Sequence, residues 1–268
     1  MTDDAKAPGE RATSRSGWTR DPRLGLAALG VSVAAFGVSV LPWLTGNDFD
    51  GRVRAYLLDH PEVLEEMLQA RQVQQQAAGT QAINAAINAD AALLAHDPRD
   101  PAIGPAPDQA SVTVHQFFDY RCPGCKSVAP GFLEIIQANP DVRFVFKEWP
   151  ILDRPDAQTS TYAALAALAA HAQGRYLDVH QALMAEPALD VEGVNRVLRD
   201  AGVDMAAATA AIESGGVTGH VGDIHETARA LNLQGTPTFI VNGRALGDID
   251  PRAVAQAIAE ARGSAPAS

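Results

Sequence analysis

The sequence has very few cysteines and lysines, and both shortages restrict the protein's chemistry. Among 268 residues there are only two cysteines, Cys122 and Cys125, which are separated by a proline and a glycine. A chain with one such pair is not a disulfide-stapled scaffold, so its thiol chemistry is confined to a single place. Only three lysines occur, and 32 acidic against 21 basic residues give a formal net charge of −11. No nucleic acid is expected as a partner, because phosphate binding requires a basic surface.

One long stretch without charge lies near the N-terminus. No charged residue occurs from Leu24 to Asn47, and residues 24–44 are apolar over a length that suits a membrane-spanning helix. Four arginines precede the stretch, and this bias keeps the N-terminus in the cytoplasm. No Ala-x-Ala site follows it, so an uncleaved anchor is favoured over a cleaved signal peptide. We expect a cytoplasmic tail over 1–23, a single-pass transmembrane helix over 24–44, and a remainder in the periplasm or otherwise outside the cytoplasm.

The next segment, 45–95, is predicted to be a helical stalk. Proline at the first turn and nearby acids mark a helix start at Asp59-His60-Pro61-Glu62. Two apolar stripes follow, and their members are Val63, Leu64, Met67 and Leu68, and then Ile83, Ile87 and Leu94. An apolar stripe must be buried somewhere, so a homo-oligomer formed through 50–95 is the alternative to a simple stalk. Four prolines in 96–110 predict a linker.

The last predicted domain, 111–268, alternates between strand and helix patterns. The expected elements in chain order are a strand over 111–118, a helix over 123–138, a strand over 142–149, helices within 156–231, strands over 238–241 and 244–246, and a helix from 251 to about 263. The first three form a right-handed βαβ unit with parallel strands. Asn242-Gly243 predicts a type I′ hairpin. This order predicts an α/β, thioredoxin-like fold with a helical domain inserted at about 156–231.

Cys122 is predicted to lie where the first strand of this domain ends and a helix begins. A sulfur at that point faces unpaired N–H groups and the positive end of the helix dipole, which favour the nucleophilic thiolate. Pro123 suits the first helical position. Cys125, one turn later, is expected to be the more buried partner, while Arg121 and Lys126 flank the pair and favour the anion. The pattern predicts a thiol–disulfide redox pair.

Other interpretations of the cysteine pair are weaker. A structural disulfide that closes so short a loop adds little stability. A zinc site needs four ligands, and only His115 is close in sequence. Attachment of a c-type haem is excluded because residue 126 is lysine and not histidine. We expect no metal and no cofactor. One alternative function is a metal-binding module that uses the CxxC motif. A further alternative is a membrane-tethered interaction protein in which the cysteine pair has no chemical role.

A second motif, Gly235-Thr236-Pro237-Thr238, comes immediately before the hairpin strand. A proline at a strand entry, preceded by a small β-branched residue, is a candidate cis peptide. Taken alone, the motif fits an ordinary trans-proline turn better. Together with the cysteine pair, it favours a site where the Thr236 backbone pairs with an extended substrate. Thr236 and Pro237 are therefore the candidate substrate-binding residues.

Three segments of the chain together resemble the DsbA family of bacterial disulfide oxidoreductases. They are Phe117-Phe118-Asp119-Tyr120-Arg121-Cys122-Pro123-Gly124-Cys125, Phe144-Val145-Phe146-Lys147-Glu148-Trp149-Pro150, and Gly235-Thr236-Pro237-Thr238. Residues 53–62 resemble the N-terminal extension of ScsC-like and Com1-like members. The resemblance covers 111–265 and implies that Cys122 is the attacked cysteine, Cys125 its partner and Pro237 a cis-proline.

The chain departs from this family at positions that bear on the redox direction. Gln116 stands where many relatives carry a buried acid, and Pro-Gly separates the cysteines where strong oxidases often have histidine second. Lys147 and Glu148 alternate along the second strand, so at most one of them faces the active site. Lys126, Lys147 and Glu148 are candidate residues for tuning the reactivity of Cys122 or Cys125. The alternative for Lys147 and Glu148 is that they are charges that face outward from the end of the strand.

The combined expectation is an extracytoplasmic thiol–disulfide oxidoreductase. It is expected to exchange a disulfide between Cys122 and Cys125 with the thiols of client proteins. The favoured role is that of an oxidase in oxidative protein folding, and the alternative is an oligomeric isomerase or reductase. Its expected partners are client proteins with thiols or disulfides and a membrane protein that recycles the pair.

Overall fold

The computed structural model describes residues 29–38, 49–155 and 157–264. The chain divides into two compact units, Met1–Leu68 and Gln69–Ser268. Within the first unit, residues 29–38 form a helix, α2 spans Phe49–Asp59 and α3 (Pro61–Ala89) begins. None of the helices that the structure describes has the length and apolar character to cross a membrane. The predicted anchor, 24–44, is described only at 29–38, and its other residues and the predicted tail lie outside the described residues.

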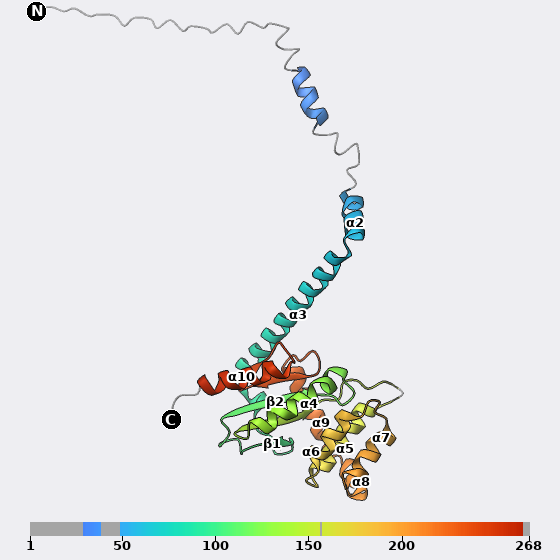
Figure 1. The fold of residues 1–268 in the computed structure, drawn as a ribbon, viewed down its shortest axis with the longest axis vertical. Helices are drawn as coiled ribbons and strands as arrows, with labels where there is room; N and C mark the ends of the chain where they lie inside the picture. The colour runs from blue at the N-terminus through green and yellow to red at the C-terminus, as the bar shows by residue number, and fades with distance from the viewer. Residues whose placement is uncertain (1–28, 39–48, 156, 265–268) are drawn as a thin grey trace, which may run out of the picture. The chain divides into compact units, whose positions relative to one another are not determined.

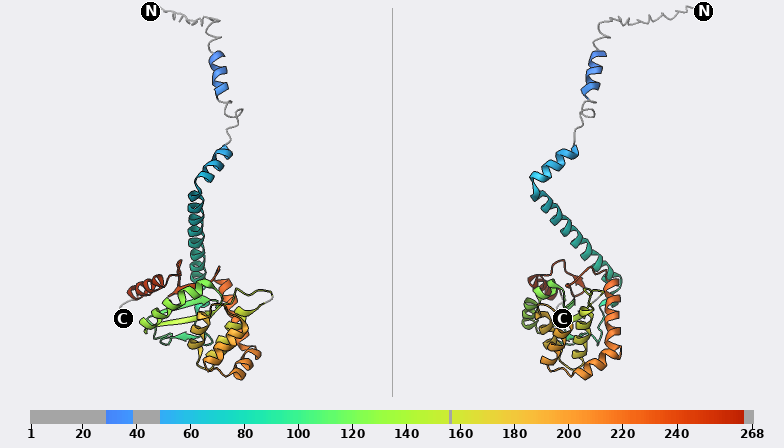
Figure 2. Two further views of the ribbon diagram at one scale, coloured as in Figure 1. Left: turned by 45° about the vertical axis from the view of Figure 1, so that its right-hand side comes forward. Right: turned by 90° about the vertical axis from the view of Figure 1, so that its right-hand side faces the viewer.

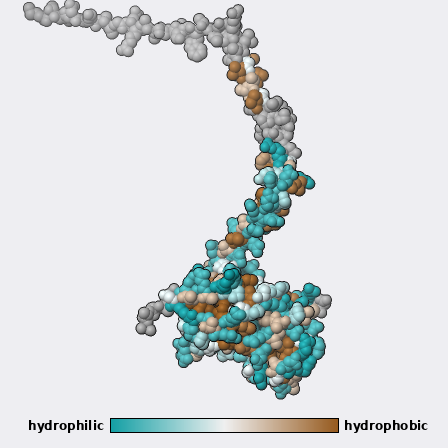
Figure 3. Space-filling model, viewed as in Figure 1, coloured by the Kyte–Doolittle hydropathy of each residue, from teal (hydrophilic) through white to brown (hydrophobic). Residues whose placement is uncertain are grey.

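Apolar side chains are exposed along the helices of the first unit. Figure 3 shows hydrophobic atoms interspersed with hydrophilic ones along α2 and the start of α3. Leu64, Met67 and Leu68, which form the first predicted stripe with Val63, are each more than half exposed. A hollow of about 380 Å³ is lined by Phe49, Asp50, Val53, Arg54, Leu57, Leu58 and Leu64. Three of the four members of the first stripe are therefore exposed among the residues that the structure describes.

Unit 2 is built on a five-stranded mixed sheet with the order β1-β3-β2-β4-β5. Figure 1 labels β1 and β2 of this sheet. The strands are β1 (Ala102–Ile103), β2 (Val112–Phe118), β3 (Val142–Glu148), β4 (Thr238–Val241) and β5 (Arg244–Ala245). β2 and β3 are parallel, and the other neighbours are antiparallel. The two central strands are buried at nearly every position, which explains why they are apolar on both faces.

Helices cover both faces of this sheet. They are α4 (Pro123–Ala138), α5 (Thr159–His171), α6 (Tyr176–Ala185), α7 (Val191–Asp200), α8 (Met205–Glu213), α9 (Gly216–Ala230) and α10 (Pro251–Ser264). The helices α5 to α9 form the predicted insertion between β3 and β4. In Figures 1 and 2 they gather on the side of the unit away from α10, which is drawn in red.

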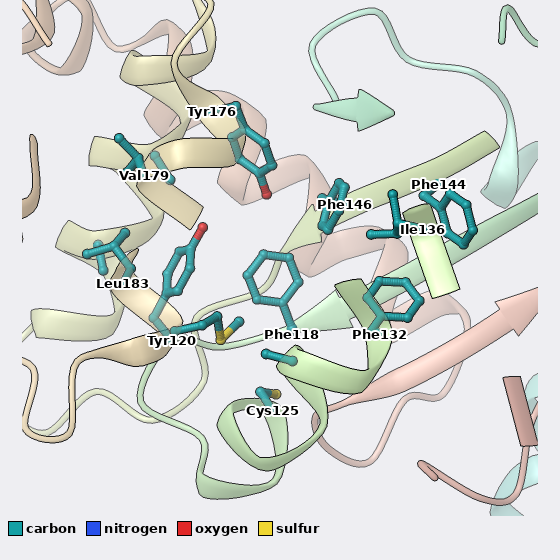
Figure 4. Close-up of a cluster of buried hydrophobic side chains, with 14 of the residues drawn as sticks. Phe118, Tyr120, Cys125, Phe132, Ile136, Phe144, Phe146, Tyr176, Val179 and Leu183 are labelled. Carbon is teal, nitrogen blue, oxygen red and sulfur yellow. The ribbon is translucent and has the colours of Figure 1, made fainter. Parts of the chain in front are cut away.

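The alternation of side chains along β2 and β3 separates two hydrophobic cores. The core on one face contains Phe118, Phe144 and Phe146 of the strands together with Phe132, Tyr176 and Ile258 of α4, α6 and α10, and Figure 4 shows part of it. The core on the other face contains Phe117 and Ile240 of the sheet together with Ile83, Ile87 and Ile224 of α3 and α9. We call these the α4 face and the α9 face.

The end of α3 and the proline-rich segment differ from the expected stalk and linker. Ile83 and Ile87, from the second predicted stripe, are buried against the sheet. A short 3₁₀ helix, η1 (Ala91–Leu94), follows, and residues 96–110 then contain the edge strand β1. The Phe146 N–H donates to the Pro101 carbonyl over 2.9 Å. Prolines are compatible with an edge strand, because its outer side needs no ladder hydrogen bond. The packed unit therefore begins well before residue 111.

The predicted hairpin is present between β4 and β5. Asn242 and Gly243 have φ values of 44° and 77°, as a type I′ turn requires at both central positions. The Asn242 side chain also accepts a hydrogen bond from the Thr113 N–H over 2.8 Å. The turn pairs β5 with β4. The antiparallel pairing of β4 with β2 brings the segment before β4 to the end of the sheet where α4 begins.

Candidate active site

Cys122 caps the N-terminus of α4, as predicted. Its backbone is extended (φ −71°, ψ 119°), Pro123 occupies the first turn of the helix, and the Lys126 N–H donates to the Cys122 carbonyl over 3.1 Å. The helix therefore starts at the residue that carries the sulfur. The first N–H groups of α4 have no partner within the helix and point toward this end.

The two sulfur atoms lie in different environments, and both cysteines are free thiols in the structure. Cys122 is 8% exposed, whereas Cys125 is completely buried. Hydrogen bonding from Cys125 lowers the pKa of Cys122 to about 5, outweighing burial, and the backbone N–H groups of Cys125 and Gly124 add to the effect. Hydrogen bonding to Cys122, followed by burial, raises the pKa of Cys125 above its ordinary value. In the reduced pair, these shifts favour loss of the proton from Cys122 and its retention on Cys125.

The predicted second motif lies directly against Cys122. The Thr236–Pro237 peptide bond is cis, and the Cys122 Sγ lies 3.2 Å from the Thr236 carbonyl oxygen, to which it donates a hydrogen bond while it is a protonated thiol. A Cβ atom placed on Gly124 would lie 3.3 Å from Pro237 Cδ. The glycine between the cysteines therefore permits the close approach of the proline loop. Thr236, Pro237 and the cysteine pair, expected to form one site, are brought together.

Asp119 organises the loops around the pair, a role that the sequence pattern did not reveal. Its carboxylate accepts hydrogen bonds from the backbone N–H groups of Arg121, Ile151 and Leu152 and from the Ser160 hydroxyl, over 2.7 to 2.9 Å. The contacts join the loop before α4 to the loop after β3 and to α5. The contact with Arg121 belongs to a common local turn, in which an aspartate accepts from the N–H two residues later, and such a turn can be recognised in a sequence. The contacts with Ile151, Leu152 and Ser160 join distant segments and have no sequence pattern that predicts them.

Lys126 and Arg121, which were expected to favour the anion, direct their charged groups to backbone carbonyls. The Lys126 ammonium donates to the carbonyls of Leu183, Met184 and Glu186, which lie at the C-terminal end of α6. A cation is stabilised there because the last carbonyls of a helix have no helical partner and carry the negative end of the dipole. The Arg121 guanidinium donates to the Leu152 carbonyl over 3.1 Å. The Lys126 side chain thus links α4 to the end of α6, and the Arg121 side chain links the loop before α4 to the loop after β3.

Lys147 and Glu148 point to opposite faces of the sheet, as their alternation predicts. Lys147 pairs with Phe117 in the β2–β3 register, and Glu148 pairs with Phe118. Lys147 therefore lies on the α9 face, where its ammonium forms a buried ion pair with Asp100. Glu148 lies on the α4 face, the side that contains Cys125. Neither side chain is an outward-facing surface charge.

His115 lies on the α9 face and not beside the cysteines. It alternates with Gln116 along β2, and its Nδ1 atom is buried without a hydrogen-bond partner. Burial lowers the pKa of His115 to about 4. Among the residues that the structure describes, no three histidine, cysteine or acidic side chains are grouped so as to hold a metal ion. His115, the residue that the metal-site alternative would add to the two cysteines, therefore lies on the opposite face of the sheet from Cys125.

The chain matches two protein-family models. A model described as "Thioredoxin" matches residues 96–260. A second model, described as "Copper resistance protein ScsC N-terminal domain", matches residues 47–78. The first match begins before β1 and so includes the segment that the sequence pattern suggested was a linker.

Solved structures and curated proteins extend these matches. A thioredoxin-like oxidoreductase from Silicibacter pomeroyi is 35% identical, with a TM-score of 0.59, over 65% of this chain and 98% of that one. The thiol-disulfide exchange protein alpha-DsbA2 from Wolbachia pipientis is 21% identical, with a TM-score of 0.60, over 68% and 97% of the two chains, and so supports the fold.

Among curated proteins, a Na⁺/H⁺ antiporter, NhaA 3, from Salinispora tropica is 31% identical over 140 residues. The matched region is 52% of this chain and 21% of that protein, so the chain spans about a fifth of the length of this curated relative. The family match, in contrast, covers most of unit 2 and contains the cysteine pair, the cis-proline loop and the whole sheet. The chain therefore belongs to the thioredoxin family, is similar in fold to alpha-DsbA2, and is similar to ScsC over residues 47–78.

Proposed function

We propose that the protein is a thiol–disulfide oxidoreductase that acts through Cys122 and Cys125. The observation that carries this proposal is the position of the Cys122 sulfur, at the N-terminus of α4 and 3.2 Å from the Thr236 carbonyl. The surroundings that lower the pKa of Cys122 to about 5 make it a thiolate at neutral pH. A thiolate is both the nucleophile and the better leaving group in disulfide exchange.

The oxidase reaction then proceeds in two displacements. A client thiolate attacks the Cys122 sulfur of the oxidised pair, the bond between Cys122 and Cys125 breaks, and the Cys125 sulfur leaves with the electron pair and takes up a proton. A second client thiolate attacks the client sulfur of the mixed disulfide, and Cys122 leaves as the thiolate. Two client thiols become one disulfide, and two electrons pass to the pair. Of the two client protons, one ends on Cys125 and one is released.

Clients are proposed to bind as extended chains along the cis-proline loop. The Thr236 backbone lies next to the reacting sulfur, where an added strand would place a client cysteine. Three apolar side chains in neighbouring loops, Ile151, Leu152 and Ile249, are 36 to 39% exposed. The Ile249 side chain comes within 3.8 Å of the Cβ position at Gly124. These residues offer a rim that contacts apolar client side chains without requiring a particular sequence.

We propose oxidase as the direction of the reaction, because a stabilised Cys122 thiolate favours the reduced form. Measurement of the reduction potential of the full-length chain in glutathione buffers tests this. An oxidase is expected to have a potential near that of DsbA, about −120 mV, whereas about −180 mV or lower would indicate an isomerase or reductase. An exposed variant such as Ser127→Ala, outside the pair, serves as the matched control.

The N-terminal part is proposed to anchor the catalytic unit outside the cytoplasm and to bring copies together. The charge-free segment 24–44 and the arginines before it support the anchor, and sedimentation of the chain with membranes after alkaline washing tests it.

The exposed Leu64, Met67 and Leu68 support self-association. Leu64→Glu is expected to lower the mass of the detergent-extracted protein by light scattering. A membrane protein that exchanges disulfides with Cys122 is the proposed recycling partner.

A further inference from the structure

Asp119 is a buried acid beside the redox pair, and the exchange reaction described above does not use it. It is 2% exposed and comes three residues before Cys122 in the chain. Its backbone is bonded to the reacting cysteine, because the Cys122 N–H donates to the Asp119 carbonyl over 3.1 Å. A buried carboxyl group costs free energy unless it is hydrogen-bonded, so the groups that Asp119 binds indicate its role.

The two oxygens of the Asp119 side chain divide their partners. Oδ1 accepts from the Arg121 N–H over 2.7 Å and from the Ser160 hydroxyl over 2.9 Å. Oδ2 accepts from the N–H groups of Ile151 and Leu152 over 2.8 and 2.9 Å. Two successive backbone N–H groups that point at one oxygen form a concave anion site. Here the anion that fills the site is a side chain of the loop before α4.

The two residues that Oδ2 holds are apolar and exposed. Ile151 and Leu152 are 36% and 38% exposed, and they form two thirds of the rim described above. The loop is also fixed on both sides of them. The Trp149 N–H donates to the carbonyl of the last residue of β2 over 3.0 Å, and the Asp153 carboxylate accepts from the Ser160 N–H over 2.7 Å. A backbone held in this way cannot turn both side chains inward, so they stay available to a partner.

The rim lies close to the reacting sulfur. The Arg121 guanidinium donates to the Leu152 carbonyl over 3.1 Å, so the residue next to Cys122 holds the rim as well. Ile249, the third rim residue, and the Cys122 sulfur lie 3.8 and 3.7 Å from the same Cβ position at Gly124. A client that binds the sulfur therefore meets the rim with the residues beside its own cysteine.

The contacts of Asp119 differ from those of helix-capping aspartates in the same domain. Asp190 and Asp204 accept from backbone N–H groups in the first turns of α7 and α8, as N-cap residues commonly do. The donors to Asp119 instead come from three segments, the loop before α4, the loop after β3, and α5. Its carboxylate thus joins the active-site loop to the rim.

We propose that Asp119 makes apolar chains the preferred clients, by holding Ile151 and Leu152 in place beside Cys122. The inference rests on the proposed function and adds the class of client, a chain with apolar side chains next to its cysteine. Apolar contact is non-directional and needs no particular sequence. A loop that became ordered only when a client arrived would lose part of the interaction free energy to that ordering. Asp119 acts through the rim, so it is a positioning residue and not a catalytic one.

The preference can be measured with two peptides, each with two cysteines, that carry either leucines or serines beside those cysteines. The rate constant for oxidation of each peptide by the oxidised full-length chain is followed by mass spectrometry in a single turnover. The leucine-to-serine ratio is expected to be about ten in the unaltered chain, at the low end for an apolar contact, and below about three in Asp119→Ala. Both peptides meet the same sulfur, so a change in Cys122 reactivity cancels in the ratio.

Three further proteins separate support of the rim from a general structural role. Asp119→Asn keeps an oxygen that accepts from both rim N–H groups, while its amide group donates to the Ser160 hydroxyl, and is expected to retain the ratio. Asp204→Ala removes a carboxylate that accepts from two backbone N–H groups at the start of α8, and is the matched control, with the ratio retained. Ile151→Ala with Leu152→Ala is expected to lower the ratio, and Asp119→Ala added to this pair is expected to lower it no further.

Hydrogen exchange of the Ile151 and Leu152 amides keeps the test conclusive even where Asp119→Ala does not fold. In Asp119→Asn, slow exchange with a retained ratio, or fast exchange with a lost ratio, supports the proposal. A retained ratio with fast exchange, or a lost ratio with slow exchange, would overturn it. Equal ratios in Asp119→Ala and the unaltered chain, or a ratio near one in the unaltered chain, would also overturn it. Failure of the unaltered chain to oxidise either peptide would instead contradict the proposed function.

Discussion

Cys122→Ser is expected to reduce disulfide exchange with a client peptide to the uncatalysed background rate. A serine oxygen cannot form the mixed disulfide, and Cys125 has a raised pKa and is completely buried, so it cannot replace Cys122 as the attacked sulfur. The rate of oxidation of a two-cysteine peptide, followed by mass spectrometry, measures the loss.

The fold is expected to survive this change, because Cys122 occupies the N-cap position of α4 and serine is a favoured residue at that position. Far-ultraviolet circular dichroism is expected to be unaltered. Ser127→Ala, which removes a hydroxyl bonded to the Gly124 carbonyl one turn further on, is the matched control and is expected to retain activity. Substantial exchange by the Cys122→Ser protein would show that the reaction does not pass through this sulfur.

Asp100→Asn is expected to lower the free energy of unfolding by about 3–5 kcal/mol, the typical cost of breaking a buried ion pair by removing one partner. The side chains of Asp100 and Lys147 are 2% and 6% exposed. Without the carboxylate, the Lys147 ammonium would be left buried and unpaired on the α9 face. His220 Nε2 lies 3.1 Å from the other oxygen, Asp100 Oδ1, and an imidazole carries no negative charge that could replace the lost carboxylate. Urea unfolding followed by tryptophan fluorescence measures the change.

Two further variants separate charge from packing in this experiment. Glu192→Gln breaks an ion pair with Arg199 in which both side chains are at least half exposed, and is expected to cost less than about 1 kcal/mol. The double variant Asp100→Leu with Lys147→Met replaces both charges by apolar groups and is expected to recover most of the lost stability. A loss in the double variant as large as in Asp100→Asn would mean that shape, and not the unpaired charge, is responsible.

Elements with a local signal were predictable from the sequence. The bounds of α4 match the prediction because Pro123 marks its start and Asn139-Pro140 prevents its continuation. The type I′ turn at Asn242-Gly243 was predictable because few residues tolerate positive φ at both positions. The strand β1 was not, because two residues within a proline-rich segment carry no periodic pattern. It exists only through its pairing with β3, some forty residues later.

The candidate site shows the same division between local and distant contacts. Cys122, Cys125 and the cis-proline were identified from short motifs, and the structure brings them together. The hydrogen bonds of Lys126 could not be predicted, because its partners on α6 lie 57 to 60 residues further along the chain. The contacts of Asp119 with the loop after β3 and with α5 were missed for a similar reason. Hydrogen bonds that join three segments leave no spacing that a single sequence reveals.

The central claim, that Cys122 exchanges disulfides with client thiols, is tested most directly by trapping the mixed disulfide. In Cys125→Ser the Cys122 thiolate attacks the disulfide of an oxidised client peptide, and one peptide sulfur leaves as a thiol. No Cys125 sulfur is present to displace the peptide from Cys122, so the mixed disulfide is expected to persist. Peptide mapping is expected to find the bond at Cys122, released by dithiothreitol and absent in Cys122→Ser. If Cys125→Ser forms no mixed disulfide with a peptide in excess, the account of this protein as a thiol–disulfide oxidoreductase is contradicted.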